Sequence, residues 1–348
     1  MPNAGAAVAI ACLFFRTNRE PVSRAQSKPL RFGTAVEHYH LPNRRHRRSE
    51  FEFWKDTNMK NLIFSLRQIC RHNRDGSYKT QADRERMLIL IGKQLDALGY
   101  RMDTAGSLKP KHIDALVSRW TKEELSPGSI KNRMSVLRWL SCKIGKQGII
   151  ARANEAYGIA DRQWVTNEDK GRTLTEGELT AVSDPYTQIS LRLQAAFGLR
   201  REESIKFQPE WADRGDRLIL KASWTKGGRL REIPIRTEDQ RALIDEAKAL
   251  AKATAQGSLI SRDTYVDQLQ VFKYQCDKVG IHHVHGHRHR YAQRRYHELT
   301  GRACPSAGGP TSRRLFGDAK TRDRRARLTI SAELGHTREQ VTAVYLGR

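Results

Sequence analysis

Four successive segments between Met59 and Tyr157 carry apolar residues at helical spacing, and this pattern constrains the first half of the chain more than any other feature. Apolar residues that recur every three or four positions form one face of an amphipathic helix. The segments begin near residues 59, 81, 110 and 127, and the last follows a Ser-Pro pair that is typical of a helix start. We therefore expect residues 59–157 to form an all-helical domain.

The pattern changes in the second half of the chain. Residues 158–172 are polar without an apolar stripe and predict a linker. A capping box at Thr175 and Glu178 then indicates a helix start. Residues 217–224 and 230–235 predict two strands joined by a glycine-bearing hairpin, and helical spacing resumes at 239–253 and 263–279. Residues 173–348 are thus expected to form a mixed α+β domain with a small antiparallel sheet.

The first 58 residues show no sustained periodicity and contain the basic run Arg44–Arg48, so they predict a disordered leader. The apolar run at residues 4–15 is too short to span a bilayer and has no positive residue before it, which argues against a transmembrane helix or signal peptide. The five cysteines are widely spaced without a Cys-x-x-Cys pair. This pattern fits a reducing cytoplasm rather than a disulfide framework or a zinc ribbon.

The charge balance indicates the kind of partner. Lys and Arg number 63 against 38 Asp and Glu, a net charge of +25, which favours a polyanion and nucleic acid before a membrane surface. Two regions are candidates for contact with DNA phosphates: one face of the fourth helix and a Gly-, Pro- and Arg-rich segment at 304–327 that predicts a surface loop. For the helix face, ordinary solvated surface is the alternative. The candidate residues are Lys131, Arg133, Arg138, Arg313 and Arg324.

Tyr345 stands nine positions after His336, which ends the tripeptide Leu334-Gly335-His336. A tyrosine hydroxyl has an ordinary pKa of about 10 and is a poor nucleophile at neutral pH. It becomes useful when it is aligned with an electrophile and surrounded by cations that stabilise transition-state charge. Tyr345 is therefore a candidate nucleophile only if such cations occur elsewhere in the chain.

Two upstream motifs supply candidate cations. Arg200 and Glu203 follow an apolar helix that Gly198 ends, and an arginine held by a nearby carboxylate can clamp a phosphate with two hydrogen bonds. His285 and Arg288 have the same three-residue spacing just before a helix predicted at 290–299. Lys226, in the hairpin turn, is a further flexible cation.

A metal site is the competing interpretation of the second motif, because five of the eight residues from His282 to His289 are histidine. However, no cysteine or carboxylate stands at a ligand-like spacing, and Arg288 lies within the run. We therefore predict no metal and no other cofactor.

Taken in chain order, the Gly-Leu-Arg-x-x-Glu motif, the hairpin lysine, His-x-x-Arg-His and Leu-Gly-His with its tyrosine resemble the tyrosine recombinase, or phage integrase, family. The resemblance covers the chain from about Thr173 to the end, and the segment from Met59 is similar to the family's SAM-like core-binding domain. It implies site-specific recombination of duplex DNA, integrating or excising a mobile element or prophage through a 3′-phosphotyrosyl intermediate. It also implies a tetramer on paired DNA sites and an accessory DNA-bending protein.

The resemblance further implies a role for each residue at a matching position. Arg200 and Arg288 would clamp the scissile phosphate, while His285 and His336 would handle protons and hydrogen-bond the phosphate. Lys226 would protonate the leaving 5′ oxygen and Tyr345 would attack. Glu203 and His289 would support these residues.

Two other functions remain open at this point. A type IB topoisomerase would share the nucleophile but act as a monomer without site preference. A catalytically silent DNA-binding protein would be expected if Tyr345 were displaced from the phosphate.

Overall fold

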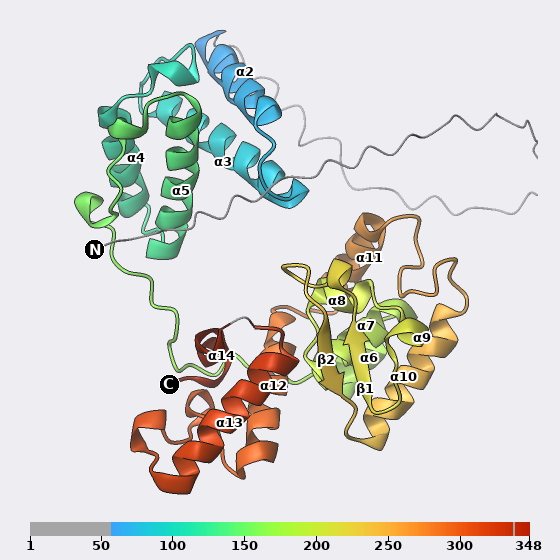
Figure 1. Cartoon of the computed structure of the whole chain (residues 1–348). Helices are drawn as coiled ribbons and strands as arrows, with labels where there is room; N and C mark the ends of the chain where they lie inside the picture. Colours follow the sequence, from blue (N-terminus) through green and yellow to red (C-terminus); the bar gives the residue numbers. More distant parts are fainter. Residues whose placement is uncertain (1–56, 337) are drawn as a thin grey trace, which may run out of the picture. The chain divides into compact units, whose positions relative to one another are not determined.

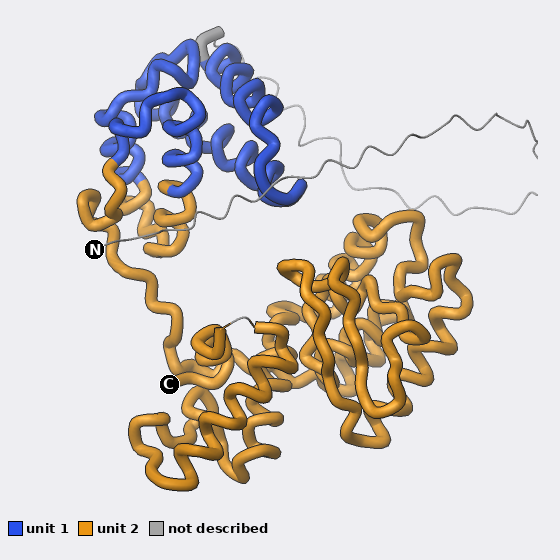
Figure 2. Tube along the Cα trace, in the orientation of Figure 1, with its two compact units in different colours: residues 1–119, 135–150 blue, residues 120–134, 151–348 orange. Residues whose placement is uncertain are grey.

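The computed structural model describes residues 57–336 and 338–348, so the predicted leader lies outside the described residues except for its last two positions. The chain divides into two compact units (Figure 2). The first contains the described residues up to Arg119 together with Ser135–Ile150, and the second contains Trp120–Met134 and Ala151–Arg348. The domain boundaries expected from the sequence stay predictions. Within the described part, no helix is long and apolar enough to cross a bilayer.

Four helices form where the apolar spacing predicted them (Figure 1). They are α2 (Thr57–His72), α3 (Tyr78–Ala97), α4 (Pro110–Lys122) and α5 (Pro127–Lys143). In the first unit many of the spaced apolar residues are buried, because burying one apolar stripe of each helix is what stabilises such a bundle. Those buried include Leu62, Leu66, Leu88, Ile91, Leu116 and Leu137.

The second unit is mostly helical and has one two-stranded sheet, as expected from the sequence. After residue 150, its first α-helix is α6 (Glu176–Ala181), whose capping box at Thr175 and Glu178 is present. The chain continues through α7 (Pro185–Phe197), α8 (Arg201–Ile205), α9 (Pro209–Ala212), β1 (Arg217–Leu220), β2 (Arg231–Pro234), α10 (Glu238–Ala251), α11 (Tyr265–Lys278), α12 (His285–Thr300), α13 (Gly317–Glu333) and α14 (Glu339–Leu346).

The hairpin is confirmed, but its strands are shorter than predicted. β1 and β2 pair antiparallel over four residues each, with Leu218 opposite Ile233 and Leu220 opposite Arg231. Residues 222–224, predicted as strand, form a 3₁₀ turn that buries Trp224. That turn ends the ladder early, so the connection between the strands is longer than the predicted five residues.

Two further predictions were wrong in their extent. α12 begins at His285, so His285 and Arg288 lie in its first turn rather than before it. Residues 304–327 are not one surface loop, because Cys304, Pro305 and Ser306 are buried and residues from Gly317 onward belong to α13. Glycine and proline end helices locally, and their density in residues 304–317 hid the helix that follows.

The main core of the second unit lies between the sheet and helices α7, α10, α12, α13 and α14. Apolar residues from every one of these elements meet there, among them Phe197, Leu218, Ile233, Ile244, Tyr291, Ile330 and Leu346. Elements separated by more than a hundred residues are thereby held together, and the motifs singled out in the sequence lie at their ends.

Candidate active site

Three histidines surround the side chain of Tyr345 on α14. The Tyr345 hydroxyl lies 3.2 Å from Nε2 of His285, and the tyrosine is 7% exposed. The His289 ring centre is 4.5 Å from the tyrosine ring and the His336 ring is stacked at 5.3 Å. Residues from the start of α12 and from the C-terminal end of the chain therefore contribute to one cluster.

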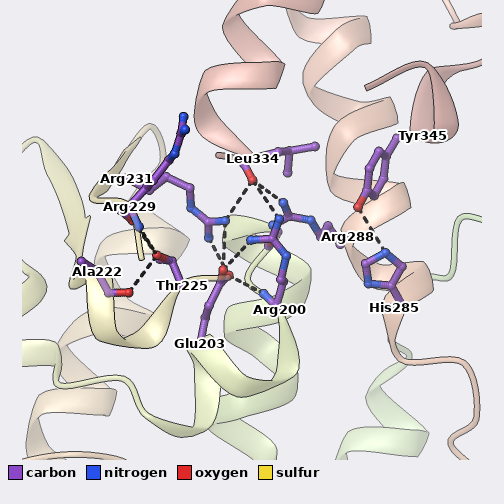
Figure 3. Close-up of polar contacts among 11 residues, drawn as sticks. Arg200, Glu203, Ala222, Thr225, Arg229, Arg231, His285, Arg288, Leu334 and Tyr345 are labelled. Atoms are coloured by element: carbon purple, nitrogen blue, oxygen red, sulfur yellow. Dashed lines mark hydrogen bonds and ion pairs between the residues drawn. The ribbon is translucent and has the colours of Figure 1, made fainter. Parts of the chain in front are cut away.

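Arg200, Arg288 and Glu203 form a second cluster beside the tyrosine (Figure 3). Glu203 is completely buried, and its Oε1 accepts a hydrogen bond of 2.6 Å from Nη1 of Arg200. Its Oε2 accepts one of 2.7 Å from the backbone N–H of Arg200. The predicted Arg200–Glu203 pair is therefore present. The Arg288 guanidinium is 1% exposed and its Cζ lies 5.7 Å from the centre of the Tyr345 ring.

The carbonyl oxygen of Leu334, at the end of α13, accepts hydrogen bonds from three guanidinium groups (Figure 3). The donors are Arg200 at 3.5 Å, Arg231 at 3.1 Å, and Arg288, which also donates to the carbonyl of Gly198. A carbonyl at a helix C-terminus carries partial negative charge and is a good partner for cations. Three arginine side chains are thus held at the C-terminal end of α13, close to His336 in the chain.

Gly335 allows this close approach. Its φ of +64° lies in the left-handed region, and a Cβ there would stand 2.8 Å from Cδ of Arg231. Gly286, inside the His285–Arg288 motif, has a similar reason to be glycine, because a Cβ would meet Cβ of Arg172 at 2.7 Å. A larger residue at either position would push apart the segments that build the site.

The arginines set the charge state of the carboxylate between them. Burial by itself would raise the pKa of Glu203, but the nearby guanidiniums of Arg231, Arg288 and Arg200 together outweigh it and lower the pKa. Glu203 is therefore ionised at neutral pH.

The same surroundings keep the histidines neutral. Burial, followed by the charges of Arg288 and Arg200, lowers the pKa of His336 to about 3 and that of His285 to about 4. The pKa of His289 also falls to about 4, through burial and then its neighbour His285. Although part of His285 is exposed, its ring packs against Tyr345 and His289. A neutral imidazole has one nitrogen lone pair, so Nε2 of His285 can accept a hydrogen bond from the tyrosine hydroxyl.

Lys226 is the one predicted catalytic residue that lies apart from these clusters within the described structure. Its side chain is exposed in the turn between β1 and β2. The turn is held by Thr225, whose Oγ1 donates to the carbonyl of Arg229 at 2.5 Å and accepts from the Arg229 N–H at 3.0 Å (Figure 3). Its expected role stays a prediction.

The residues predicted to contact DNA fall into two groups. Arg313 and Arg324 line an open cavity of about 730 Å³ beside α13 and α14. On α5, Lys131 forms an ion pair of 2.7 Å with Asp161, and the Arg133 guanidinium lies 5.2 Å from the centre of the Trp120 ring. Arg138, on the same helix, is half-buried. Their contact with DNA remains a prediction.

Arg231 is the site residue that the sequence reasoning missed. It begins β2 and is 4% exposed, with its guanidinium inside the arginine cluster. A signal was available, because side chains alternate along a strand and Arg231 shares the inward face with Ile233. An arginine at an inward strand position needs a buried partner, but several carboxylates lie nearer in the sequence than Glu203, so the pattern alone does not name it.

The histidine-rich segment does not assemble a metal site in the described structure. Across residues 57–336 and 338–348, no three His, Cys, Asp or Glu side chains are grouped so that they could hold a metal ion. The Nδ1 atom of His287 instead lies 3.1 Å from the carbonyl oxygen of Arg172.

Two family models match the chain in order. Residues 59–150 match the N-terminal domain of phage integrases, and residues 166–294 match the integrase model. Together the matches cover more than half of the chain, so it belongs to the phage integrase family of tyrosine recombinases and carries an integrase catalytic domain. The second match includes both arginine motifs and ends before His336 and Tyr345.

Solved structures show the same fold. A lambda integrase dimer bound to a COC′ core site is 14% identical with a TM-score of 0.52, over 82% of this chain and 78% of that chain. The XerH site-specific recombinase bound to palindromic difH in a post-cleavage complex is 13% identical with a TM-score of 0.51, over 84% and 86%. No curated protein sequence matches the chain.

Proposed function

We propose that this recombinase cuts and rejoins duplex DNA through a covalent bond between Tyr345 and a 3′ phosphate. The observation that carries the proposal is the position of the Tyr345 hydroxyl, 3.2 Å from a neutral imidazole of His285 and beside the Arg200–Arg288 cluster. A nucleophile, a proton acceptor and preorganised cations are what phosphoryl transfer requires.

Each transfer in the covalent step has a donor and an acceptor. The tyrosine oxygen forms a bond to phosphorus while the bond from phosphorus to the 5′ oxygen breaks. His285 accepts the tyrosine proton, and Lys226 gives a proton to the leaving 5′ oxygen. Arg200 and Arg288 stabilise the charge that develops on the phosphate oxygens. Because the phosphotyrosyl bond keeps the energy of the broken linkage, a second 5′ hydroxyl can reverse the step without ATP.

His336 is suited to hydrogen-bond the phosphate. Its Nδ1 lies 2.8 Å from Oγ1 of Thr342, while its Nε2 is buried with no hydrogen-bond partner in the described structure. A buried polar atom without a partner costs free energy, so a phosphate oxygen placed beside it would be stabilised.

Duplex DNA fits as the substrate because the chain carries a net charge of +25. The lambda integrase structure is itself bound to a COC′ core site, and the XerH structure is bound to a palindromic difH substrate. We infer further that the protein acts in the cytoplasm as a tetramer on paired sites, with a DNA-bending accessory protein, to move a mobile element or prophage.

Covalent capture tests the proposal and identifies the target sequence in the same experiment. Wild-type protein is incubated with nicked duplexes of random sequence, and DNA that remains attached after denaturation is sequenced. Wild type should enrich one sequence, and Tyr345→Phe should retain DNA binding but give no adduct. Adducts that persist in the variant would assign the nucleophile elsewhere.

The enriched duplex then separates the three candidate activities. A recombinase produces recombinant junctions from two copies of the site. A topoisomerase relaxes supercoiled DNA without joining partners or enriching a sequence, and a silent binding protein shifts the duplex without any adduct.

A further inference from the structure

Arg231 contacts both oxygens of a carboxylate that itself holds a catalytic arginine (Figure 3). Its Nη2 donates to Oε2 of Glu203 at 2.8 Å and its Nη1 donates to Oε1 at 3.3 Å. Taking a guanidinium out of water is costly unless charge and hydrogen bonds compensate for it. Arg231 is 4% exposed, so this contact is a built feature of the site rather than a surface ion pair.

Arg200 and Arg231 both donate hydrogen bonds to the two carboxylate oxygens of Glu203. Oε1 accepts from the side chains of Arg200 and Arg231, and Oε2 accepts from the Arg200 backbone and from Arg231. If Arg200 were the only partner of Glu203, that carboxylate would cancel much of its charge. With Arg231 present, the three guanidiniums and one carboxylate of the cluster leave a net charge of +2.

Arg231 also reaches the segment that precedes His336. Its Nη1 donates to the Leu334 carbonyl at 3.1 Å, and Gly335 packs against its Cδ. One guanidinium thereby connects α8, β2 and the end of α13. Each of these elements carries or adjoins a residue that the proposed reaction uses.

We propose that Arg231 is a positioning residue that orients Glu203 and offsets its negative charge. The positive charge of Arg200 then remains available to the phosphate. The inference rests on the proposed function. Arg231 need not touch the substrate, because it acts through Glu203 and the Leu334 carbonyl. The alternative is that Arg231 only anchors the base of the hairpin that carries Lys226, five residues earlier.

Anion binding tests the charge argument without DNA. Orthovanadate, a phosphate-sized anion, is titrated into the full chain and into R231M, the double variant R231M/E203Q, and R241M. R241M is the control because Arg241 is ion-paired to Asp213 in another part of the same unit. R231M should bind vanadate about tenfold more weakly, since loss of one guanidinium lowers the net charge of the cluster and leaves Glu203 to offset the charge of Arg200. The double variant should recover most of the loss, and R241M should match wild type.

The recovery distinguishes a charge effect from a structural one. If Arg231 merely supports the fold, removing Glu203 as well should leave binding as weak as in R231M or weaker. That outcome, or unchanged binding in R231M, overturns the inference. Should R231M fail to fold, R231K takes its place: an ammonium keeps the charge but cannot contact both carboxylate oxygens, so vanadate should bind a few-fold more weakly than to wild type. Binding by R231K equal to wild type would then count against it.

Cleavage of the captured duplex tests the consequence for catalysis. R231M should slow adduct formation by about a hundredfold, with DNA affinity within about twofold. Replacing the 5′ leaving oxygen by sulfur, which leaves without a general acid, should not restore R231M. Restoration by sulfur would mean that Arg231 acts through Lys226 instead.

The two failures are distinguishable. If wild type forms no adduct with any duplex, the proposed function fails while the vanadate series still decides the role of Arg231. If wild type cleaves and R231M cleaves equally well, the function stands and this inference falls.

Discussion

Contacts within the protein itself fix the side chains of the site. Arg288 is buried and donates to two backbone carbonyls, and Tyr345 is fixed through its ring contacts and its hydroxyl. Groups that are already oriented need little rearrangement in the transition state, which is the main advantage of a preorganised site.

Lys226 and Arg288 should respond differently to the leaving group. Lys226→Ala should slow cleavage of ordinary DNA and recover when the 5′ oxygen is replaced by sulfur, because a thiolate leaves without a proton. Arg288→Ala should slow cleavage by about 10²–10³-fold with either substrate. Sulfur at the leaving position does not remove the charge on the phosphate oxygens that Arg288 stabilises. Single-turnover adduct formation measures both, with the exposed Lys252→Ala as control. If sulfur restores Arg288→Ala but not Lys226→Ala, the two roles are wrongly assigned.

The neutral histidines should make the folded protein sensitive to acid. Folding lowers the pKa of His289 and of His336 below the ordinary value of about 6.5, so the unfolded chain binds more protons between those values. The part of the unfolding free energy that depends on these neutral histidines is therefore fully present above pH 6.5. It is lost as the pH falls toward 4. For His289, which is 6% exposed, the loss amounts to at most roughly 3 kcal/mol.

Thermal unfolding between pH 7.5 and 4.5 measures this loss. His289→Gln, which cannot be protonated in this range, should show a shallower fall in Tm than wild type. Equal slopes for the two proteins would show that His289 is not held neutral by folding.

At the scale of elements, short segments between helices bring the motifs together. Gly335 ends α13 and places His336, while the first turn of α12 carries His285 and Arg288. Such segments are sensitive to single substitutions where space is tight, and tolerant where it is open.

Gly335→Ala and Gly301→Ala form a matched pair. Both glycines follow long helices with φ of +64° and +72°, but only at Gly335 would a Cβ meet a neighbour, Cδ of Arg231. Gly301→Ala should cost about 1 kcal/mol of unfolding free energy from backbone strain and leave cleavage unchanged. Gly335→Ala should cost more and slow cleavage. Denaturant unfolding and adduct formation measure the two effects, and equal behaviour would argue against tight packing on Arg231.

The cavity beside α13 and α14 should contribute to DNA affinity but not to chemistry. Arg313→Ala or Arg324→Ala should weaken binding of the captured duplex and reduce the salt dependence of log Kd by about one unit. The cleavage rate of bound DNA should stay the same. Lys278→Ala, at the exposed end of α11, serves as control. A changed cleavage rate at saturating DNA would place these arginines nearer to the reaction.

At the scale of the whole molecule, the chain consists of two compact units, each with its own buried core. The proposed catalytic residues all belong to the second unit, and Lys131 and Arg133 belong to it as well, although the sequence places them on a helix of the N-terminal domain. Because both buried cores lie within the described residues, we expect these residues to fold without residues 1–56.

A chain that begins at Thr57, the first residue of α2, should fold like the full chain. Residues 1–56 show no apolar periodicity, so removing them should change Tm by less than about 2 °C and leave adduct formation intact. Calorimetry and covalent capture on the two chains compare them directly. A large loss of Tm would show that the leader packs on one of the units.

The sequence alone determined the helices of the first half, the hairpin, the capping box at Thr175 and the motif residues from Arg200 to Tyr345. These follow from local spacing and from residue chemistry, which do not depend on distant contacts. The start of α12 and the helix after residue 316 were missed, because glycines, prolines and charged residues obscured the local pattern.

Only the tertiary structure decided that Arg231 belongs to the site and that Leu334 supplies a carbonyl to three guanidiniums. Arg231 and Glu203 are 28 residues apart, and Arg231 and Leu334 are 103 apart. A main-chain carbonyl has no residue type that could mark it in a sequence. A buried arginine is recognised only when the partners that compensate its charge are identified, and those partners are brought to it by the packing of the whole unit.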